Sequence, residues 1–215
     1  MRRLKNAAHG ALAAFALAAM AASFSSSPAS AQALPSFDCA KSQNAIEKLI
    51  CGNSGLAALD VETTRLFDLA KAGDGGGELL LSQREWLGRR NDCASSTDKQ
   101  RCVAESYVQR ISQLRERYPV TRKRDSEGIS LGPFNAICRD FSEQVTVTFV
   151  NSNPAYAFVG WSLNSVVLKQ AMSGSGALYE AQYPKGQSRL WNKGNNAQIA
   201  LPGGKDMSCA LKPMG

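Results

Sequence analysis

The spacing of apolar residues changes once along this chain, and the change divides it into two kinds of structure. Between Ser36 and Arg117 the apolar residues recur every three or four positions, which is the period of helices that bury one face. After Pro133 apolar and polar residues alternate, which is the period of β-strands with one buried face. We therefore expect an α+β protein with an all-α N-terminal half and an antiparallel β C-terminal half.

The helical pattern contains several separate runs. The clearest apolar face is formed by Val103, Tyr107, Ile111 and Leu114. Helices are predicted over residues 44–51, 56–70, 79–93 and 103–114. Ser54 is the expected N-cap of the second helix, because a hydroxyl before an apolar run can accept the first free amide hydrogens. The glycines of residues 73–77 separate the second helix from the third.

The alternating pattern consists of short segments separated by turn residues. Strands are predicted over residues 145–150, 155–161, 163–170, 188–192, 197–201 and 207–211. Asn, Gly and Pro clusters lie between them, as in Asn151-Ser152-Asn153-Pro154. Several short strands at this spacing are typical of a small antiparallel barrel or sandwich.

The segment between the two halves is polar and basic. Residues 117–132 include Pro119 and the run Arg122-Lys123-Arg124, and we interpret them as a solvated linker, with a docking site as the alternative. The predicted organisation is therefore a helical domain over 32–116, a linker over 117–132 and a β-domain over 133–215.

Residues 1–31 have the form of a secretory signal peptide. Arg2, Arg3 and Lys5 precede an apolar run over 11–22, and Ala29-Ser30-Ala31 provides small residues for cleavage. The apolar run is too short to span a bilayer, and no cysteine for lipid attachment follows it closely. We expect a periplasmic or secreted protein without a membrane anchor.

The six cysteines predict a disulfide framework, because they form an even set in a chain with an export signal. Six cysteines allow about 15 pairings. The spacing favours Cys39–Cys51, Cys93–Cys102 and Cys138–Cys209. A zinc site is disfavoured, because the chain has no closely spaced cysteine pair and its single histidine, His9, lies in the predicted signal peptide. No metal or other cofactor is expected.

The lack of histidine after residue 31 also excludes the commonest catalytic sites. Neither a Ser-His-Asp nor a Cys-His site can be assembled, so we expect no enzymatic activity. A glycosidase that uses two carboxylates, such as Glu143 and Glu180, is the remaining catalytic alternative. The formal net charge of +7 includes three basic residues of the signal peptide, and such a mild excess does not predict nucleic-acid binding.

Two features of the β-half could carry a binding function. The run from Ser173 to Tyr179 reads Ser-Gly-Ser-Gly-Ala-Leu-Tyr, in which glycines on both sides of Ser175 let the backbone project a small hydroxyl. The run Leu190-Trp191-Asn192-Lys193-Gly194 ends a strand with a lysine at a turn. An ordinary Gly/Ser hairpin loop, and a core tryptophan followed by a solvated lysine, are the structural alternatives.

Together these features resemble the MliC and PliC inhibitors of c-type lysozyme. The matching parts are Cys138, the Val-Thr-Val-Thr-Phe strand, Ser175-Gly176-x-x-Tyr179, Trp191-x-Lys193-Gly194 and Cys209. The resemblance implies an eight-stranded antiparallel barrel closed by a Cys138–Cys209 bond. It also implies that Ser175, Gly176, Tyr179, Lys193 and Gly194 form a lysozyme-binding site, with Ser175 and Lys193 reaching the catalytic carboxylates.

The sequence departs from these inhibitors at three places. Leu178 replaces an arginine that is common before the tyrosine, and Gly174 replaces an alanine. The stretch from Tyr179 to Trp191 is longer and contains Pro184-Lys185-Gly186, so Lys185 is an alternative to Lys193.

The N-terminal half resembles the LprI-like domains, some of which inhibit lysozyme. The matching parts are Phe37-Asp38-Cys39-Ala40, Ile50-Cys51, residues 56–60, Gln83-Arg84-x-Trp86, Arg90-x-x-Cys93 and the segment from Cys102 to Ile111. For Asp60, Trp86 and Arg90, a buried ion pair against an aromatic ring and a binding role are both open.

The predicted function is inhibition of c-type lysozyme in the periplasm, with the lysozyme as protein partner. The first alternative is a cell-envelope module that binds glycan, with peptidoglycan as its partner and no inhibitory activity. In the second alternative, only the helical half acts on lysozyme.

Overall fold

The computed structural model describes residues 33–73, 76–123, 127–139 and 141–215. The predicted signal peptide, residues 1–31, lies outside them. The described residues from Ala33 onward belong to a single compact unit. No helix in this described part of the chain combines the length and the apolar character that crossing a bilayer requires.

The N-terminal half is helical, as predicted. The α-helices are α1 (Ala45–Cys51), α2 (Ser54–Gly73), α3 (Gly77–Asn91) and α4 (Lys99–Arg117). Short 3₁₀ turns are η1 (Cys39–Lys41), η2 (Asp92–Ser95) and η3 (Pro119–Arg122). The expected cap of α2 was wrong by one residue: the side chain of Asn53 accepts the Leu56 amide hydrogen at 3.0 Å, and Ser54 is already helical.

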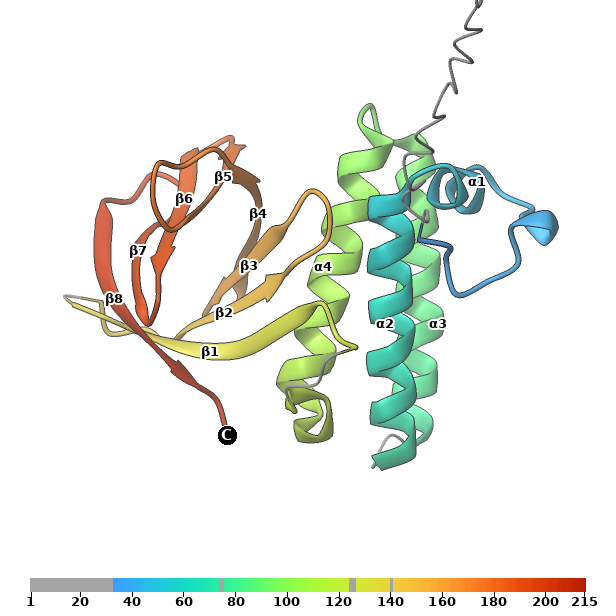
Figure 1. The fold of residues 1–215 in the computed structure, drawn as a ribbon, viewed down its shortest axis with the longest axis horizontal. Helices are drawn as coiled ribbons and strands as arrows, with labels where there is room; N and C mark the ends of the chain where they lie inside the picture. The colour runs from blue at the N-terminus through green and yellow to red at the C-terminus, as the bar shows by residue number, and fades with distance from the viewer. Residues whose placement is uncertain (1–32, 74–75, 124–126, 140) are drawn as a thin grey trace, which may run out of the picture. The chain divides into compact units, whose positions relative to one another are not determined.

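The C-terminal half is a closed antiparallel barrel in which each strand pairs with the next and β8 pairs with β1 (Figure 1). Its strands are β1 (Ser130–Cys138), β2 (Val145–Val150), β3 (Tyr156–Trp161), β4 (Asn164–Ala171), β5 (Ala177–Tyr183), β6 (Gly186–Lys193), β7 (Asn196–Ala200) and β8 (Asp206–Pro213). The α+β fold class is therefore confirmed.

The segment between the halves is more structured than a solvated linker. Residues 119–122 form η3, and β1 begins at Ser130, three residues before the expected start of the β-domain. The guanidinium of Arg122 donates to the backbone carbonyls of Arg115 and Glu116, so this part of the basic run is folded against α4.

The three expected disulfides are confirmed. Cys39 is bonded to Cys51, Cys93 to Cys102 and Cys138 to Cys209, which leaves no free cysteine in the chain. Cys138 and Cys209 are register partners on β1 and β8, so the third bond fastens the seam that closes the barrel.

The two halves share a hydrophobic core. Val150, Phe158 and Val167, which point outward from β2, β3 and β4, are buried in the same cluster as the apolar residues of the helices. Helix α4 lies along this face of the barrel (Figure 1). The buried Ser112 and Thr148 hydroxyls form a hydrogen bond of 3.2 Å across the junction. The barrel interior has its own core, which includes Leu168, Leu190 and Ile199.

Candidate functional site

Pairing of β5 with β6 brings the predicted serine and lysine to one end of the barrel. Ser175 and Gly176 lie in the loop between β4 and β5, and Lys193 is the last residue of β6. Ala177 is the register partner of Asn192, so Ser175 and Lys193 are both within two residues of one cross-strand pair. Both residues are exposed, so the hydroxyl and the ammonium are accessible to solvent at this end of the barrel.

The backbone of Ser175 is held from two directions. The indole nitrogen of Trp191 donates to the Ser175 carbonyl at 2.8 Å, and the Ser173 hydroxyl donates to the same oxygen at 2.7 Å. Gly176 has a φ of +69°, and a Cβ there would lie 2.5 Å from the Asn192 carbonyl oxygen. Only glycine fits this position, because a side chain would meet backbone in a conformation that already disfavours it.

The turn after Lys193 is also fixed by local hydrogen bonds. The side-chain amide of Asn192 donates to the Gly194 carbonyl at 2.9 Å and to the Asn196 carbonyl at 3.1 Å. Gly194 has a φ of +61°, as the tight connection between β6 and β7 requires. The ammonium of Lys193 is therefore presented by a structured turn.

Trp191, part of the motif noted in the sequence, supports this site although we did not count it among the binding residues. Leu190 points into the barrel, so the neighbouring Trp191 points outward and its half-buried indole reaches across to the Ser175 loop. The structural alternative of a core tryptophan does not hold, because the indole lies on the outer face of the barrel. The alternation of inward and outward residues along β6 was the signal that could have revealed it.

Two other predicted positions do not reach the exposed site. Tyr179 is 4% exposed, and its ring lies 5.7 Å from that of Phe149 inside the barrel, where burial raises the pKa of its hydroxyl. Lys185 lies in the turn between β5 and β6, at the other end of this hairpin. Seven residue steps along β6 separate the two ends by about 23 Å, so Lys185 cannot replace Lys193.

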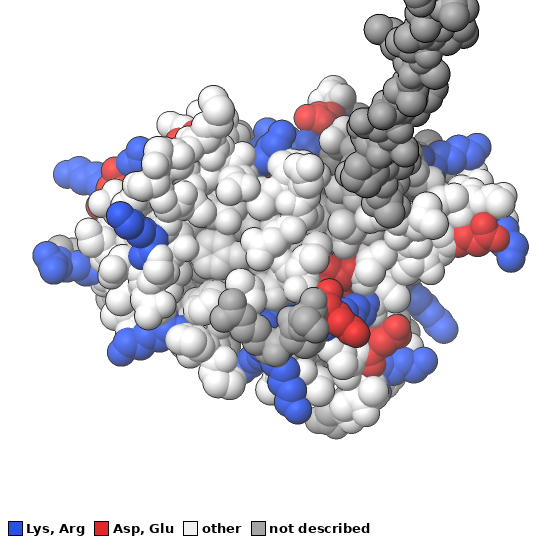
Figure 2. All heavy atoms as spheres, in the orientation of Figure 1, with Lys and Arg blue, Asp and Glu red and all other residues white. Residues whose placement is uncertain are grey.

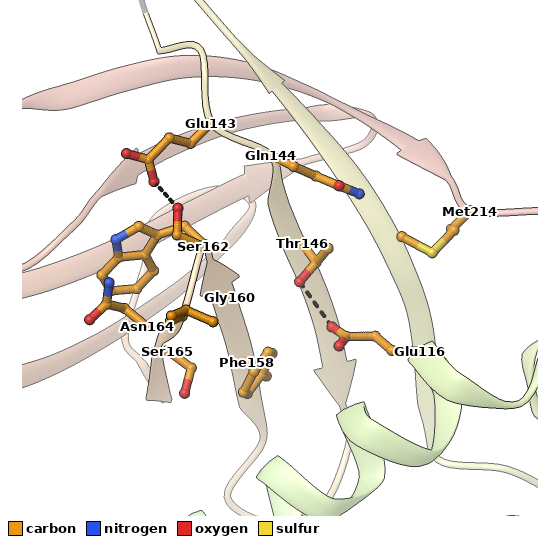
Figure 3. Close-up of a pocket in the computed structure, with 12 residues that line it drawn as sticks. Glu116, Glu143, Gln144, Thr146, Phe158, Gly160, Ser162, Asn164, Ser165 and Met214 are labelled. Atoms are coloured by element: carbon orange, nitrogen blue, oxygen red, sulfur yellow. Dashed lines mark hydrogen bonds between the residues drawn. The ribbon is translucent and has the colours of Figure 1, made fainter.

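A separate cavity of about 600 Å³ lies between the end of α4 and the strands β2 to β4. Its described lining includes Glu116, Glu143, Gln144, Asn164 and Phe158 but no basic residue. Figure 3 shows Glu116 hydrogen-bonded to Thr146 on one wall of the cavity and Glu143 hydrogen-bonded to Ser162 on the other. Glu180 lines a different groove, with Lys169, so the carboxylate pair that we considered for a glycosidase is not assembled.

The Asp60, Trp86 and Arg90 side chains of the helical half are buried against one another. Asp60 and Arg90 are about 95% buried, with 3.9 Å between Oδ1 and Nη1. The Tyr107 hydroxyl accepts from Arg90 at 2.9 Å and donates to Asp60 at 2.8 Å. Arg90 also lies 5.6 Å from the centre of the Trp86 ring. Burial, and then the charge of Asp60, raise the pKa of Tyr107.

The distribution of charged groups bears on nucleic-acid and metal binding. Figure 2 shows basic side chains scattered mainly along the margin of the drawn face, without a continuous patch. Among the described residues no cluster of three or more His, Cys, Asp or Glu is arranged to hold a metal ion.

Comparison with known proteins agrees with both predicted resemblances. The family model for the membrane-bound lysozyme-inhibitor of c-type lysozyme, MliC, matches residues 138–208, from the end of β1 into β8. Lipoprotein LprI from Mycobacterium bovis and from two strains of Mycobacterium tuberculosis is 29% identical over 170 residues, covering 79% of this chain and 83% of LprI. No solved structure gives a significant match.

The length of the LprI match is informative by itself. Any stretch of 170 residues in a chain of 215 must include residues 46–170, which contain α2, α3, α4 and the first strands of the barrel. The similarity to LprI therefore extends beyond the helical half to which we assigned it. The predicted resemblance to MliC and LprI is confirmed: the β-half is similar to the membrane-bound inhibitors of c-type lysozyme, and most of the chain is similar to LprI.

Proposed function

We propose that this protein is an exported, non-catalytic inhibitor of c-type lysozyme. Its Ser175 loop and Lys193 enter the active-site cleft of the enzyme. The observation that carries the proposal is the placement of an exposed hydroxyl and an exposed ammonium at one end of a closed, disulfide-fastened barrel. The similarity to a family of c-type lysozyme inhibitors supplies the class of partner.

The chemistry of the cleft suits these two groups. A lysozyme of this type works with one protonated and one ionised carboxyl group. The Ser175 hydroxyl hydrogen-bonds to the acid, and the Lys193 ammonium pairs with the carboxylate. Each charge-assisted bond in a desolvated cleft contributes about 1.5–3 kcal/mol. Because Trp191 and Ser173 already hold the Ser175 backbone, little conformational entropy is lost on binding.

The direct test is inhibition of a c-type lysozyme by the purified, oxidised chain. Ser175→Ala and Lys193→Ala should each weaken inhibition by about 10- to 150-fold, which corresponds to 1.5–3 kcal/mol. Lys185→Ala is the matched control, because this exposed lysine lies at the opposite end of the same hairpin. Full inhibition by the Ser175→Ala, Lys193→Ala double variant would refute the proposed contacts.

A second candidate function is glycan binding in the cavity beside α4. The lining amides of Gln144 and Asn164 and the carboxylates of Glu116 and Glu143 provide the hydrogen-bonding groups that sugar hydroxyls need. Co-sedimentation with purified cell-wall sacculi measures this binding. If it is the function, Asn164→Ala abolishes sedimentation, while Ser175→Ala leaves it unchanged.

A further inference from the structure

The corner between α1 and α2 lies against the barrel end that presents Ser175. A Cβ on Gly55, the second residue of α2, would lie only 2.2 Å from the Asn153 carbonyl oxygen in the β2–β3 loop. The backbones of the helical corner and this loop are therefore in direct contact.

The β2–β3 loop is in turn the neighbour of the Ser175 loop. The Gln170 amide, near the end of β4, donates to the Ala155 carbonyl at 2.8 Å, which ties the β2–β3 loop to the strand that leads into the Ser175 loop. Strands β2, β4 and β6 all end on this side of the antiparallel barrel, because alternate strands run in the same direction. The connections after these three strands form one rim.

The corner is a fixed surface and is open to solvent. The Cys39–Cys51 bond holds the last residue of α1, and the Asn53 side chain caps α2. Gly52, which lies between these restraints, and Ser54, which follows them, are exposed. On the barrel side Asn153 is exposed too, and none of these residues is charged. Such neutral amide and hydroxyl groups are typical of the polar rim of a protein interface.

The size of a typical inhibitor interface decides whether this corner takes part. An inhibitor buries about 800 Å² of its own surface, which corresponds to a disc with a radius of about 16 Å. The β2–β3 and β4–β5 loops are two strand positions apart, or about 10 Å. The helical corner is in direct contact with the β2–β3 loop, so it lies at the margin of a disc centred on Ser175.

We infer that the lysozyme-docking face is composite. The rim loops of the barrel enter the active-site cleft of lysozyme and contact its edges, and the α1–α2 corner contacts the enzyme surface beside the cleft. This inference rests on the proposed function and assigns the helical half a direct part in binding. Its contribution is a neutral, hydrogen-bonding shoulder beside the β2–β3 loop, on the side of the rim opposite the Lys193 turn.

The test is a bulky substitution at the corner in the full-length oxidised protein. Ser54→Trp adds an indole at an exposed position without removing the Asn53 cap. Gly52→Trp is the second variant, because Gly52 has ordinary helical φ and ψ and a Cβ there would have no neighbour closer than 3.5 Å. The control is Gly88→Trp on α3, where nothing lies within 4 Å of a Cβ.

Lysozyme inhibition and the unfolding midpoint are measured for each variant. We expect both corner variants to raise the inhibition constant at least tenfold with an unchanged midpoint, and the Gly88→Trp control to inhibit like the wild type. If the wild type inhibits and a folded corner variant inhibits equally well, the composite face is wrong while the proposed function stands. If the wild type does not inhibit lysozyme, both are wrong.

Discussion

Replacing Gly55 by alanine tests the contact between the helical corner and the barrel. The added Cβ would lie 2.2 Å from the Asn153 carbonyl oxygen, whereas ordinary contacts begin at 3.4 Å, so one backbone must retreat by about 1 Å. Overpacking of this kind costs about 1–3 kcal/mol, and a clash with backbone belongs at the upper end. Alanine regains up to about 1 kcal/mol of helix propensity, which leaves a loss of about 2 kcal/mol.

Gly88→Ala is the matched control on α3. Position 88 is exposed and nothing lies within 4 Å of a Cβ there, so the substitution only exchanges glycine for the best helix former. It should stabilise the protein by about 1 kcal/mol. In urea denaturation with the disulfides intact, a slope of about 2 kcal/mol/M converts these values to midpoint shifts of about −1 M and +0.5 M. A midpoint for Gly55→Ala equal to that of Gly88→Ala would refute the packing argument.

The remaining predictions concern buried groups and the disulfides. Because the folded protein raises the pKa of Tyr107 above its ordinary value of 10.0, the unfolded chain loses this proton first as the pH rises. Its contribution to stability therefore falls by about 1.4 kcal/mol per pH unit above pH 10, and Tyr107→Phe should flatten the alkaline slope in pH-dependent urea titrations. Arg115 is buried and donates to the Gly132 carbonyl at 2.6 Å and to the Ser130 hydroxyl at 3.2 Å, so Arg115→Ala should cost about 2–4 kcal/mol in the same assay. Removing the Cys138–Cys209 bond, which spans 71 residues, should lower the free energy of unfolding by about 4.4 kcal/mol through loop entropy. Removing either short-loop bond should lower it by about 2.7 kcal/mol. An equal loss of stability for all three bonds would contradict this ordering.

The fold class could be predicted from the sequence because each half has a clear period. The helical faces and six of the strands follow directly from the spacing of apolar residues. Strand β1 does not, because its buried residues recur every third position and its register shifts between Leu131 and Phe134. Strand β5 was missed because it begins directly after the Ser-Gly run and has small inward residues, Ala177 and Ala181.

The packing of the halves could not be predicted from the same patterns. Val150, Phe158 and Val167 are apolar residues on the outer face of the barrel. The alternation of residues along a strand does not predict that a helix packs against them. The candidate site shows the same limit. The resemblance pointed to Ser175 and Lys193, but the inward direction of Tyr179 and the outward direction of Trp191 depend on strand register.

The connectivity of the cysteines has a consequence for how the chain matures. In sequence order, the first pairs with the second, the third with the fourth and the fifth with the sixth. Oxidation that joins the cysteines pairwise in the order in which they are synthesised therefore makes only native bonds.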